Sequence, residues 1–125
     1  MDQEIKVFLG GWDSRVSFAE QLPVLTSAGV TMVPLRRIYE LLGAEVTWDA
    51  VNERVVAKYG DNTVELKIGE PFIIVNGEVK ELGLAPYIDA TTSRTLVPLR
   101  AVSEGLGAKV SWEESIRSIL IEPLP

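Results

Sequence analysis

The sequence predicts an α+β fold made of two internal repeats, each with one short helix and one or more β-hairpins, joined by antiparallel sheet. The segment "TMVPLRRIYELLGAEVTW" at residues 31–48 returns as "TLVPLRAVSEGLGAKVSW" at residues 95–112, with the same spacing throughout. In both copies a stretch with the apolar period of a helix precedes a stretch in which apolar and polar residues alternate. We therefore expect a helix followed by a hairpin in each copy.

The two predicted helices lie between a proline and a glycine. Pro34 and Pro98 suit the first helical turn, where a missing N–H costs nothing. Gly43 and Gly107 suit the end, because the left-handed conformation that ends many helices is cheapest for glycine. The apolar residues between them form one stripe on each helix, which we expect to face the core. The stripes are Leu35, Ile38 and Leu42, and Leu99, Val102 and Leu106.

Alternating strands are predicted after each helix. In "AEVTWD" and "AKVSWE" the alternation places Val46 with Trp48, and Val110 with Trp112, on one strand face. The return strands are "RVVAKY" and "SILIE". We expect the helix stripe to cover the face with Val and Trp, so that Trp48 and Trp112 pack in the core. On that basis Trp48→Ala should cost about 3–5 kcal/mol. Exposed sugar platforms are the alternative for these two side chains.

Further strands are predicted outside the repeated segments. "IKVFLGGWDSRVSF" suggests two strands around a Gly-Gly loop, and "NTVELKIGEPF" suggests a strand followed by a turn. "FIIVNGEVKEL" has Asn76-Gly77 between apolar runs, which is the strongest short hairpin signal.

We expect one domain over residues 1–125, with the first repeat at about 5–59 and the second at about 62–122. A helix of about nine residues is not stable alone in water, and a lone hairpin is hardly better. The connection from Tyr59 to Thr63 is short and has no linker composition. The two repeats should therefore share one core in a pseudo-symmetric arrangement.

Composition excludes several classes of function. Acidic residues outnumber basic ones by 18 to 12 and the net charge is -6, which argues against binding of nucleic acid or of an anionic membrane surface. No apolar run approaches the roughly 20 residues of a membrane span. The opening "MDQEIKVFLGG" lacks a signal-peptide pattern, so we expect that the signal of an exported parent is absent from this sequence.

The chain contains no histidine and no cysteine. It therefore has no His-dependent nucleophilic triad, no two-His metal motif, no thiolate and no disulfide. Adjacent acids such as Glu113 and Glu114 point to opposite faces of a strand and do not form a glycosidase pair. We predict no catalytic, metal-binding or cofactor-binding residues and no cofactor.

Candidate contact residues are aromatic. Trp12 lies in the polar loop "GGWDS", which the second copy lacks, so its burial is open. If exposed, it would mark a contact with sugar or protein, and Tyr39, Tyr59 and Tyr87 would extend that surface.

Two polar features have more than one interpretation. Arg36 and Arg100 are each followed by a glutamate four residues later, which favours an ion pair along the helix. Stacking on Trp, capping of strand carbonyls and an anion site are the alternatives. The turn "WDAVNER" has oxygen donors for calcium at Asp49, Asn52 and Glu53, but a turn in which Asp49 bonds its own backbone is favoured.

The doubled "VPLR…LGAxVxW" pattern, the "VNGEV" hairpin and the "RTLVPLR" segment resemble the copper amine oxidase N-terminal domain-like family, also called the stalk domain. The resemblance runs from about Ile5 to Glu122. It implies a non-catalytic module of secreted or cell-surface proteins of Gram-positive bacteria. Copper in amine oxidases is held by histidines of a separate catalytic domain, so the resemblance does not imply copper in this chain.

Three hypotheses of function follow. The first is a structural or interaction module that spaces or docks a neighbouring domain at the cell surface. The second is a carbohydrate-binding module for cell-wall or extracellular polysaccharide. The third, an enzyme, has no motif in its favour. Expected partners are a protein or a polysaccharide, with neither nucleic acid nor membrane insertion, and a strand edge offers a route to a homo-oligomer.

Overall fold

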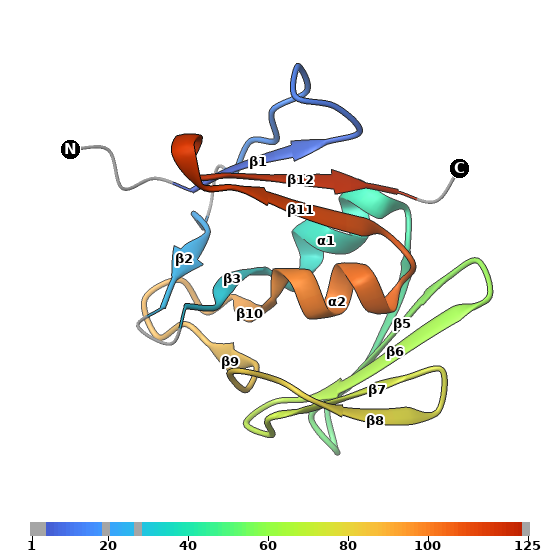
Figure 1. Ribbon diagram of the computed structural model, residues 1–125. Coiled ribbons are helices and arrows are strands. Elements are labelled where there is room, and N and C mark those ends of the chain that lie inside the picture. Colours follow the sequence, from blue (N-terminus) through green and yellow to red (C-terminus); the bar gives the residue numbers. More distant parts are fainter. Residues whose placement is uncertain (1–4, 19–20, 27–28, 124–125) are drawn as a thin grey trace.

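The computed structural model describes residues 5–18, 21–26 and 29–123, and within these ranges the strands form three sheets (Figure 1). The first has the order β1 (Lys6–Leu9), β12 (Ser118–Glu122) and β11 (Lys109–Glu113). The second has the order β2 (Val24–Leu25), β3 (Thr31–Pro34), β10 (Thr95–Pro98) and β9 (Tyr87–Ile88). The third has the order β4 (Glu45–Asp49), β5 (Arg54–Tyr59), β6 (Asn62–Lys67), β7 (Phe72–Val75) and β8 (Glu78–Glu81).

The predicted helices are present as α1 (Leu35–Leu42) and α2 (Leu99–Gly105), and a short 3-10 helix, η1 (Glu114–Ile116), joins β11 to β12. Helices α1 and α2 lie between the β1-β12-β11 sheet and the five-stranded sheet (Figure 1). All six residues of the predicted stripes are buried. Gly43 and Gly107 follow the helices with φ of 78° and 95°, as predicted. Pro34 and Pro98 each stand one residue earlier than predicted, as the last residue of β3 and β10.

The three hairpins predicted from local signals are confirmed: β4–β5, β11–β12 and β7–β8 all pair antiparallel. In the last of these, Asn76 and Gly77 have φ of 50° and 85°, as the tight turn requires. The Asn76 side-chain oxygen also accepts a hydrogen bond from the Thr63 N–H at 2.8 Å, so the hairpin is tied to β6.

The predicted antiparallel pairing holds for most strands but not for the N-terminal one. β1 pairs with β12 in parallel, with Lys6 opposite Ser118 and Leu9 opposite Ile121. The predicted second strand of the N-terminal hairpin is reduced to a single bridge between Phe8 and Arg15. No short turn joins β1 to β12, so nothing in the connection imposes an antiparallel direction.

The centre of the molecule is a strand pair that sequence patterns did not predict. β3 and β10 pair antiparallel, and the register joins corresponding positions of the two copies: Val33 faces Val97, Met32 faces Pro98, and Leu96 faces Pro34. The described residues of one contiguous apolar cluster come from both copies, with Val33 and Val97 among them. The two copies therefore meet through backbone hydrogen bonds and through packed side chains.

The predicted burial of the tryptophans at the ends of β4 and β11 is wrong, because Trp48 is 48% exposed and Trp112 is 38% exposed. Alternation placed both on the correct face: Trp48 lies opposite the buried Val55, and Trp112 opposite the buried Ile119. However, β4 and β11 are edge strands, so among the described strands none flanks either indole on its outer side. Val46 and Val110, two residues earlier, are half-buried and pack against the core.

Candidate functional site

The exposed indole of Trp48 lines an open groove of about 380 Å³, called here the Trp48 groove. One side of this groove is made by the start of α1 and by the face of β4 and β5. These residues are Pro34, Leu35, Arg36, Val46, Trp48 and Val55. The other side comes from the second copy, just before and at the start of β10, and consists of Ser93, Arg94 and Thr95.

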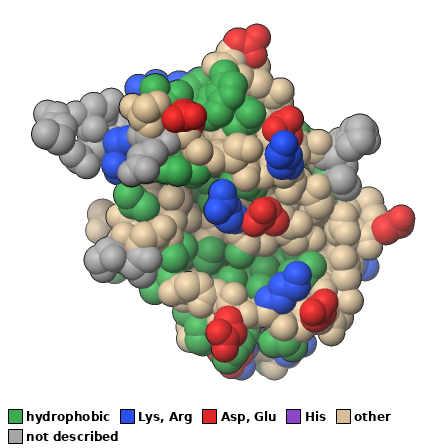
Figure 2. Space-filling view, in the orientation of Figure 1, with side chains coloured by type: hydrophobic (Ala, Val, Ile, Leu, Met, Phe, Trp, Pro, Cys, Tyr) green, Lys and Arg blue, Asp and Glu red, His purple; other side chains and the backbone are tan. Residues whose placement is uncertain are grey.

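A second groove of about 550 Å³, the Trp112 groove, is built in the same way. Its second-copy side carries Pro98, Leu99, Arg100, Val110, Trp112 and Ile119. Its opposite side includes Gly29, Val30 and Thr31 from the first copy. Figure 2 shows hydrophobic side chains reaching the surface between acidic and basic ones on the face that carries α2.

The two grooves are lined by residues at corresponding positions of the repeat. Each residue of the Trp48 groove has a counterpart 64 positions away in the Trp112 groove, as Trp48 has in Trp112 and Arg36 in Arg100. In each groove the proline, leucine, arginine, valine and tryptophan of one copy face three residues of the other copy. These are residues 93–95 in the Trp48 groove and 29–31 in the Trp112 groove. Both walls of each groove thus depend on the β3–β10 pairing that brings the copies together.

The grooves differ in charge. In the Trp112 groove the Arg100 guanidinium lies 3.9 Å from the Glu104 carboxylate and donates to the Val110 carbonyl at 3.4 Å. The ion-pair and carbonyl-capping interpretations of this arginine are therefore both confirmed. In the Trp48 groove Arg36 and Arg94 line the walls, and none of the described lining residues is acidic. The described lining of the Trp48 groove thus carries two arginines, whereas that of the Trp112 groove carries one arginine and one glutamate.

A neighbouring hollow contains a third arginine. It shares Pro34, Arg36 and Arg94 with the Trp48 groove and adds Arg37 and Glu40. The Arg37 Nε donates a hydrogen bond to the Ser17 carbonyl at 2.9 Å, and its guanidinium lies 5.9 Å from the centre of the Phe18 ring. Among the described residues, three arginines and one glutamate line this neighbouring hollow.

The structure answers the question of burial that the sequence left open for Trp12. Trp12 is 45% exposed, and its ring lies against Phe8, with centroids 5.3 Å apart and an angle of 58° between the planes. Tyr59 and Tyr87 are half-buried, and Tyr59 packs against the core. The side chain of Tyr39 lies outside the described part of the structure.

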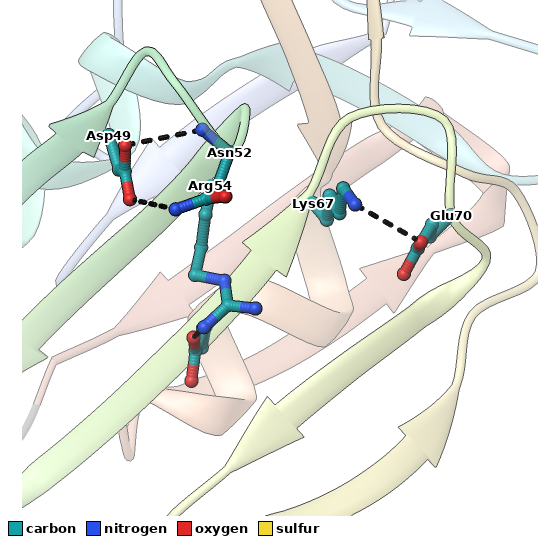
Figure 3. A network of polar contacts seen from close by, with 6 residues as sticks. Asp49, Asn52, Arg54, Lys67 and Glu70 are labelled. Atoms are coloured by element: carbon teal, nitrogen blue, oxygen red, sulfur yellow. Dashed lines mark hydrogen bonds and ion pairs between the residues drawn. The ribbon is translucent and has the colours of Figure 1, made fainter.

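The acidic turn between β4 and β5 has the geometry of a self-bonded turn. The Asp49 carboxylate accepts hydrogen bonds from the Asn52 N–H at 3.2 Å and from the Asn52 side-chain amide at 2.8 Å (Figure 3). It also accepts one from the Val51 N–H at 3.1 Å. The bond from the Asn52 side chain is the main reason why the pKa of Asp49 is lowered below 3.8. On the two neighbouring strands Arg54 pairs with Glu65 at 2.6 Å.

The donor set does not fit a copper site. Copper sites in proteins use imidazole or sulfur ligands, and the chain has no histidine or cysteine. Within the described ranges no group of three acidic side chains is placed to hold a metal ion. The acidic oxygens of the Asp49 turn are engaged by N–H donors instead.

The structure brings together side chains that sequence reasoning kept apart. An anion site was one alternative for Arg36, and in the structure Arg94 of the other copy lines the same groove. The signal was available in part, because "TMVP" and "TLVP" each combine a β-branched residue and an apolar neighbour before the helix, which is typical of a buried strand. Recognising those strands as partners would have placed Arg94 beside Arg36.

Comparison with known proteins agrees with the sequence resemblance. The model of the family described as Copper amine oxidase N-terminal domain matches residues 13–121. No curated protein matches the chain. This family is a non-catalytic domain family and is typically extracellular. Neither α1 nor α2 is long enough to cross a membrane, and the same holds for every helix in the described ranges. The match covers most of the chain, which therefore belongs to the copper amine oxidase N-terminal domain family.

Proposed function

We propose that this chain is a non-catalytic interaction module of a secreted or cell-surface protein. Its Trp48 and Trp112 grooves bind a partner at the cell surface and so attach the parent protein to that partner. One observation carries the proposal: two indoles at corresponding positions are about half exposed, each beside an apolar groove wall. Large apolar side chains left accessible in a groove are the usual anchors of a binding partner.

We also propose that the two repeats act as one pseudo-symmetric domain. The register of β3 with β10, which pairs Val33 with Val97, supports a local twofold relation between the copies. The contiguous apolar cluster supports a common core. A rigid domain of this kind holds its two grooves at a fixed spacing, which suits a module that positions a neighbour.

A polysaccharide is the second candidate for the docked partner. Trp48 lies in the same groove as Arg36 and the hydroxyl side chains of Ser93 and Thr95. A sugar ring presents C–H groups on its face and hydroxyls on its rim, so a flat indole bordered by polar groups matches it. Pairing through the β8 edge is not favoured, because Glu78, Lys80 and Glu81 on that strand are all exposed and oppose association of edges.

Co-sedimentation with insoluble bacterial cell-wall fragments tests the proposal. The chain is expected to sediment with the fragments, and the double variant Trp48→Ala, Trp112→Ala is expected to stay in the supernatant. The matched control is Trp12→Ala, which removes a similarly exposed indole outside both grooves. Circular dichroism of each variant checks that the fold is kept.

Two outcomes contradict the proposal: equal sedimentation of the double variant, or loss of sedimentation in Trp12→Ala alone. Protease treatment of the fragments separates the candidate partners. Binding that survives the treatment favours polysaccharide, and binding that disappears favours a wall protein.

A further inference from the structure

We propose that Asn76 is a site of deamidation, and that the folded chain slows this reaction by holding the Asn76 side-chain amide in a relay of hydrogen bonds that ends at helix α2. The reaction concerns the hairpin of β7 and β8 and is independent of the docking function proposed above.

The residue that follows Asn76 makes it the most reactive asparagine of the chain. Asn76 precedes Gly77, whereas the other two asparagines, Asn52 and Asn62, precede glutamate and threonine. Deamidation begins when the backbone nitrogen of the following residue attacks the Cγ atom of the asparagine. Glycine has no Cβ atom to hinder this attack. Asn76 and Gly77 are both exposed, so water reaches the turn.

The reaction consumes one water molecule and needs no other reactant. The Gly77 nitrogen forms a bond to the Asn76 Cγ atom and loses its proton, and the side-chain nitrogen leaves as ammonia. Water then opens the cyclic imide at one of its two carbonyl carbons. One opening gives aspartate, and the other gives isoaspartate, in which the backbone runs through the former side chain.

Both polar atoms of the Asn76 side chain are engaged in the fold. The side-chain oxygen accepts a hydrogen bond from the Thr63 N–H at 2.8 Å, and Nδ2 donates one to the side-chain oxygen of Asn62 at 3.2 Å. The Asn76 N–H also donates to the Thr63 carbonyl at 2.9 Å. The Cγ atom must move to reach the Gly77 nitrogen, so the two side-chain bonds have to open before the attack.

The relay continues from Asn62 to the end of α2. The Asn62 Nδ2 donates a hydrogen bond to the Leu106 carbonyl at 3.1 Å. Leu106 is the C-cap residue of α2, and the carbonyls at a helix end have no partner within the helix. Asn62 therefore supplies a donor to the helix end. Asn76 keeps the Asn62 amide in this orientation, because the Asn76 amide donates to the Asn62 oxygen.

Deamidation would break the relay at its first link. A carboxylate at position 76 can still accept the bond from Thr63, but it has no N–H to donate to Asn62. If the Asn62 amide turned to donate to the carboxylate, its oxygen would face the Leu106 carbonyl. Either arrangement loses a hydrogen bond, and isoaspartate also lengthens the backbone of the turn. We expect the modified chain to be less stable than the parent.

Peptide mapping by mass spectrometry, after incubation in warm and mildly alkaline buffer, measures the rate of deamidation at each asparagine. The reference is the same chain unfolded in guanidinium chloride. In the unfolded chain Asn76 should react faster than Asn52 and Asn62. In the folded chain the rate at Asn76 should be at least about tenfold lower, because the two side-chain bonds must open first.

Variants of Asn62 test the relay. Asn62→Ala removes the acceptor of the Asn76 amide and should raise the rate at Asn76 in the folded chain by about three- to tenfold. Asn62→Asp keeps an acceptor for that amide but loses the donor to Leu106. It should therefore protect Asn76 nearly as well as the parent chain does. Circular dichroism of each variant checks that the fold is kept.

Two controls separate a local effect from a general loss of stability. Asn52→Ala removes a side-chain amide from the turn between β4 and β5. Ile121→Val weakens the core at a side chain with 1% exposure, outside the relay. Both variants should leave the rate at Asn76 within about twofold of the parent rate, because the reaction follows local opening of the hairpin.

Asn76→Asp reproduces one product of the reaction. This variant should lower the urea midpoint of the parent chain. It should lower the midpoint less in the Asn62→Ala background, where the opposed oxygen of Asn62 is absent.

Four results would overturn the inference. They are an equal rate at Asn76 in the folded and unfolded chains, an unchanged rate in Asn62→Ala, an equal rise of the rate in Ile121→Val, and an equal shift of the midpoint by Asn76→Asp in both backgrounds. Sedimentation with wall fragments judges the docking function separately, since neither groove contains Asn76.

Discussion

At the scale of single residues, the tryptophans show what an alternating pattern can and cannot predict. The period of β4 and β11 correctly assigned the faces of Trp48 and Trp112, since each lies opposite a buried residue of the return strand. The alternating pattern does not indicate whether a further strand pairs with the outer edge of β4 or β11. An indole on the inner face of an edge strand can be half exposed, which is what the structure shows.

Stability should follow burial. Trp48→Ala should lower the free energy of unfolding by only about 1 kcal/mol, because much of the indole already contacts water. Leu106→Ala removes a side chain with 0% exposure and should cost about 2–5 kcal/mol. Urea unfolding of both variants measures the two values. A larger loss for Trp48→Ala than for Leu106→Ala would contradict the exposure of the indole.

Asp49 is expected to titrate below its ordinary range. The Asn52 side-chain hydrogen bond lowers the pKa of Asp49 in the folded protein below the unfolded value of 3.8. A lowered pKa stabilises the fold above pH 3.8, and this contribution is lost as the pH falls through the folded value. Asn52→Ala should raise the pKa of Asp49. An NMR titration of the carboxyl carbon measures both, and an unchanged pKa in the variant would contradict the assigned cause.

Arg94 is a residue that the repeat alone did not single out. It lies far along the chain from Arg36, and its counterpart in the first copy is Val30, so the repeat itself gave no reason to expect a base there. Only the β3–β10 pairing places it across the groove.

At the scale of elements, features set by local chemistry were predictable and features set by distant pairing were not. The Asn76-Gly77 turn and the glycines at 43 and 107 each require a left-handed conformation that few other residues adopt easily, so their sequence signals were strong. The parallel β1–β12 pair joins the two ends of the described chain, and no turn signal in the sequence indicates this pairing.

Close packing explains the glycine that ends helix α2. Gly105 is the last residue of α2, and a Cβ atom added there would lie 2.8 Å from Val64 Cγ2 and 3.1 Å from Val75 Cγ2. Alanine favours a helix over glycine by about 1 kcal/mol, but overpacking typically costs about 1–3 kcal/mol. We therefore expect Gly105→Ala to destabilise the protein, and Val64→Ala to reduce that penalty. Thermal unfolding of the single and double variants measures the coupling.

Ser103 in the same helix is the matched control. It has 0% exposure, and its hydroxyl has no hydrogen-bond partner among the described residues. Ser103→Ala removes an unpaired buried polar group and should raise stability by about 1 kcal/mol. Destabilisation by both alanines would mean that α2 tolerates no change at all, and a neutral Gly105→Ala would contradict the close contact with Val64.

At the scale of the whole molecule, the two copies should unfold together. The apolar cluster is contiguous across both copies, so loss of one half exposes the core of the other. Variants that keep only Trp48 or only Trp112, with the other tryptophans changed to Phe, report on each copy by fluorescence. Both should give the same urea midpoint. Two separated midpoints would show that the halves fold as independent units.

Each groove takes one of its two sides from the other copy, and this arrangement bears on how such a fold could have arisen. Thr31 of the first copy lines the groove of the second, and Thr95 of the second lines the groove of the first. An ancestral chain with a single copy could complete such a groove only by self-association of two molecules through the same central strand. Gene duplication followed by fusion would then have joined the two halves of a dimer in one chain. Each groove could afterwards change its polar and charged residues independently of the other.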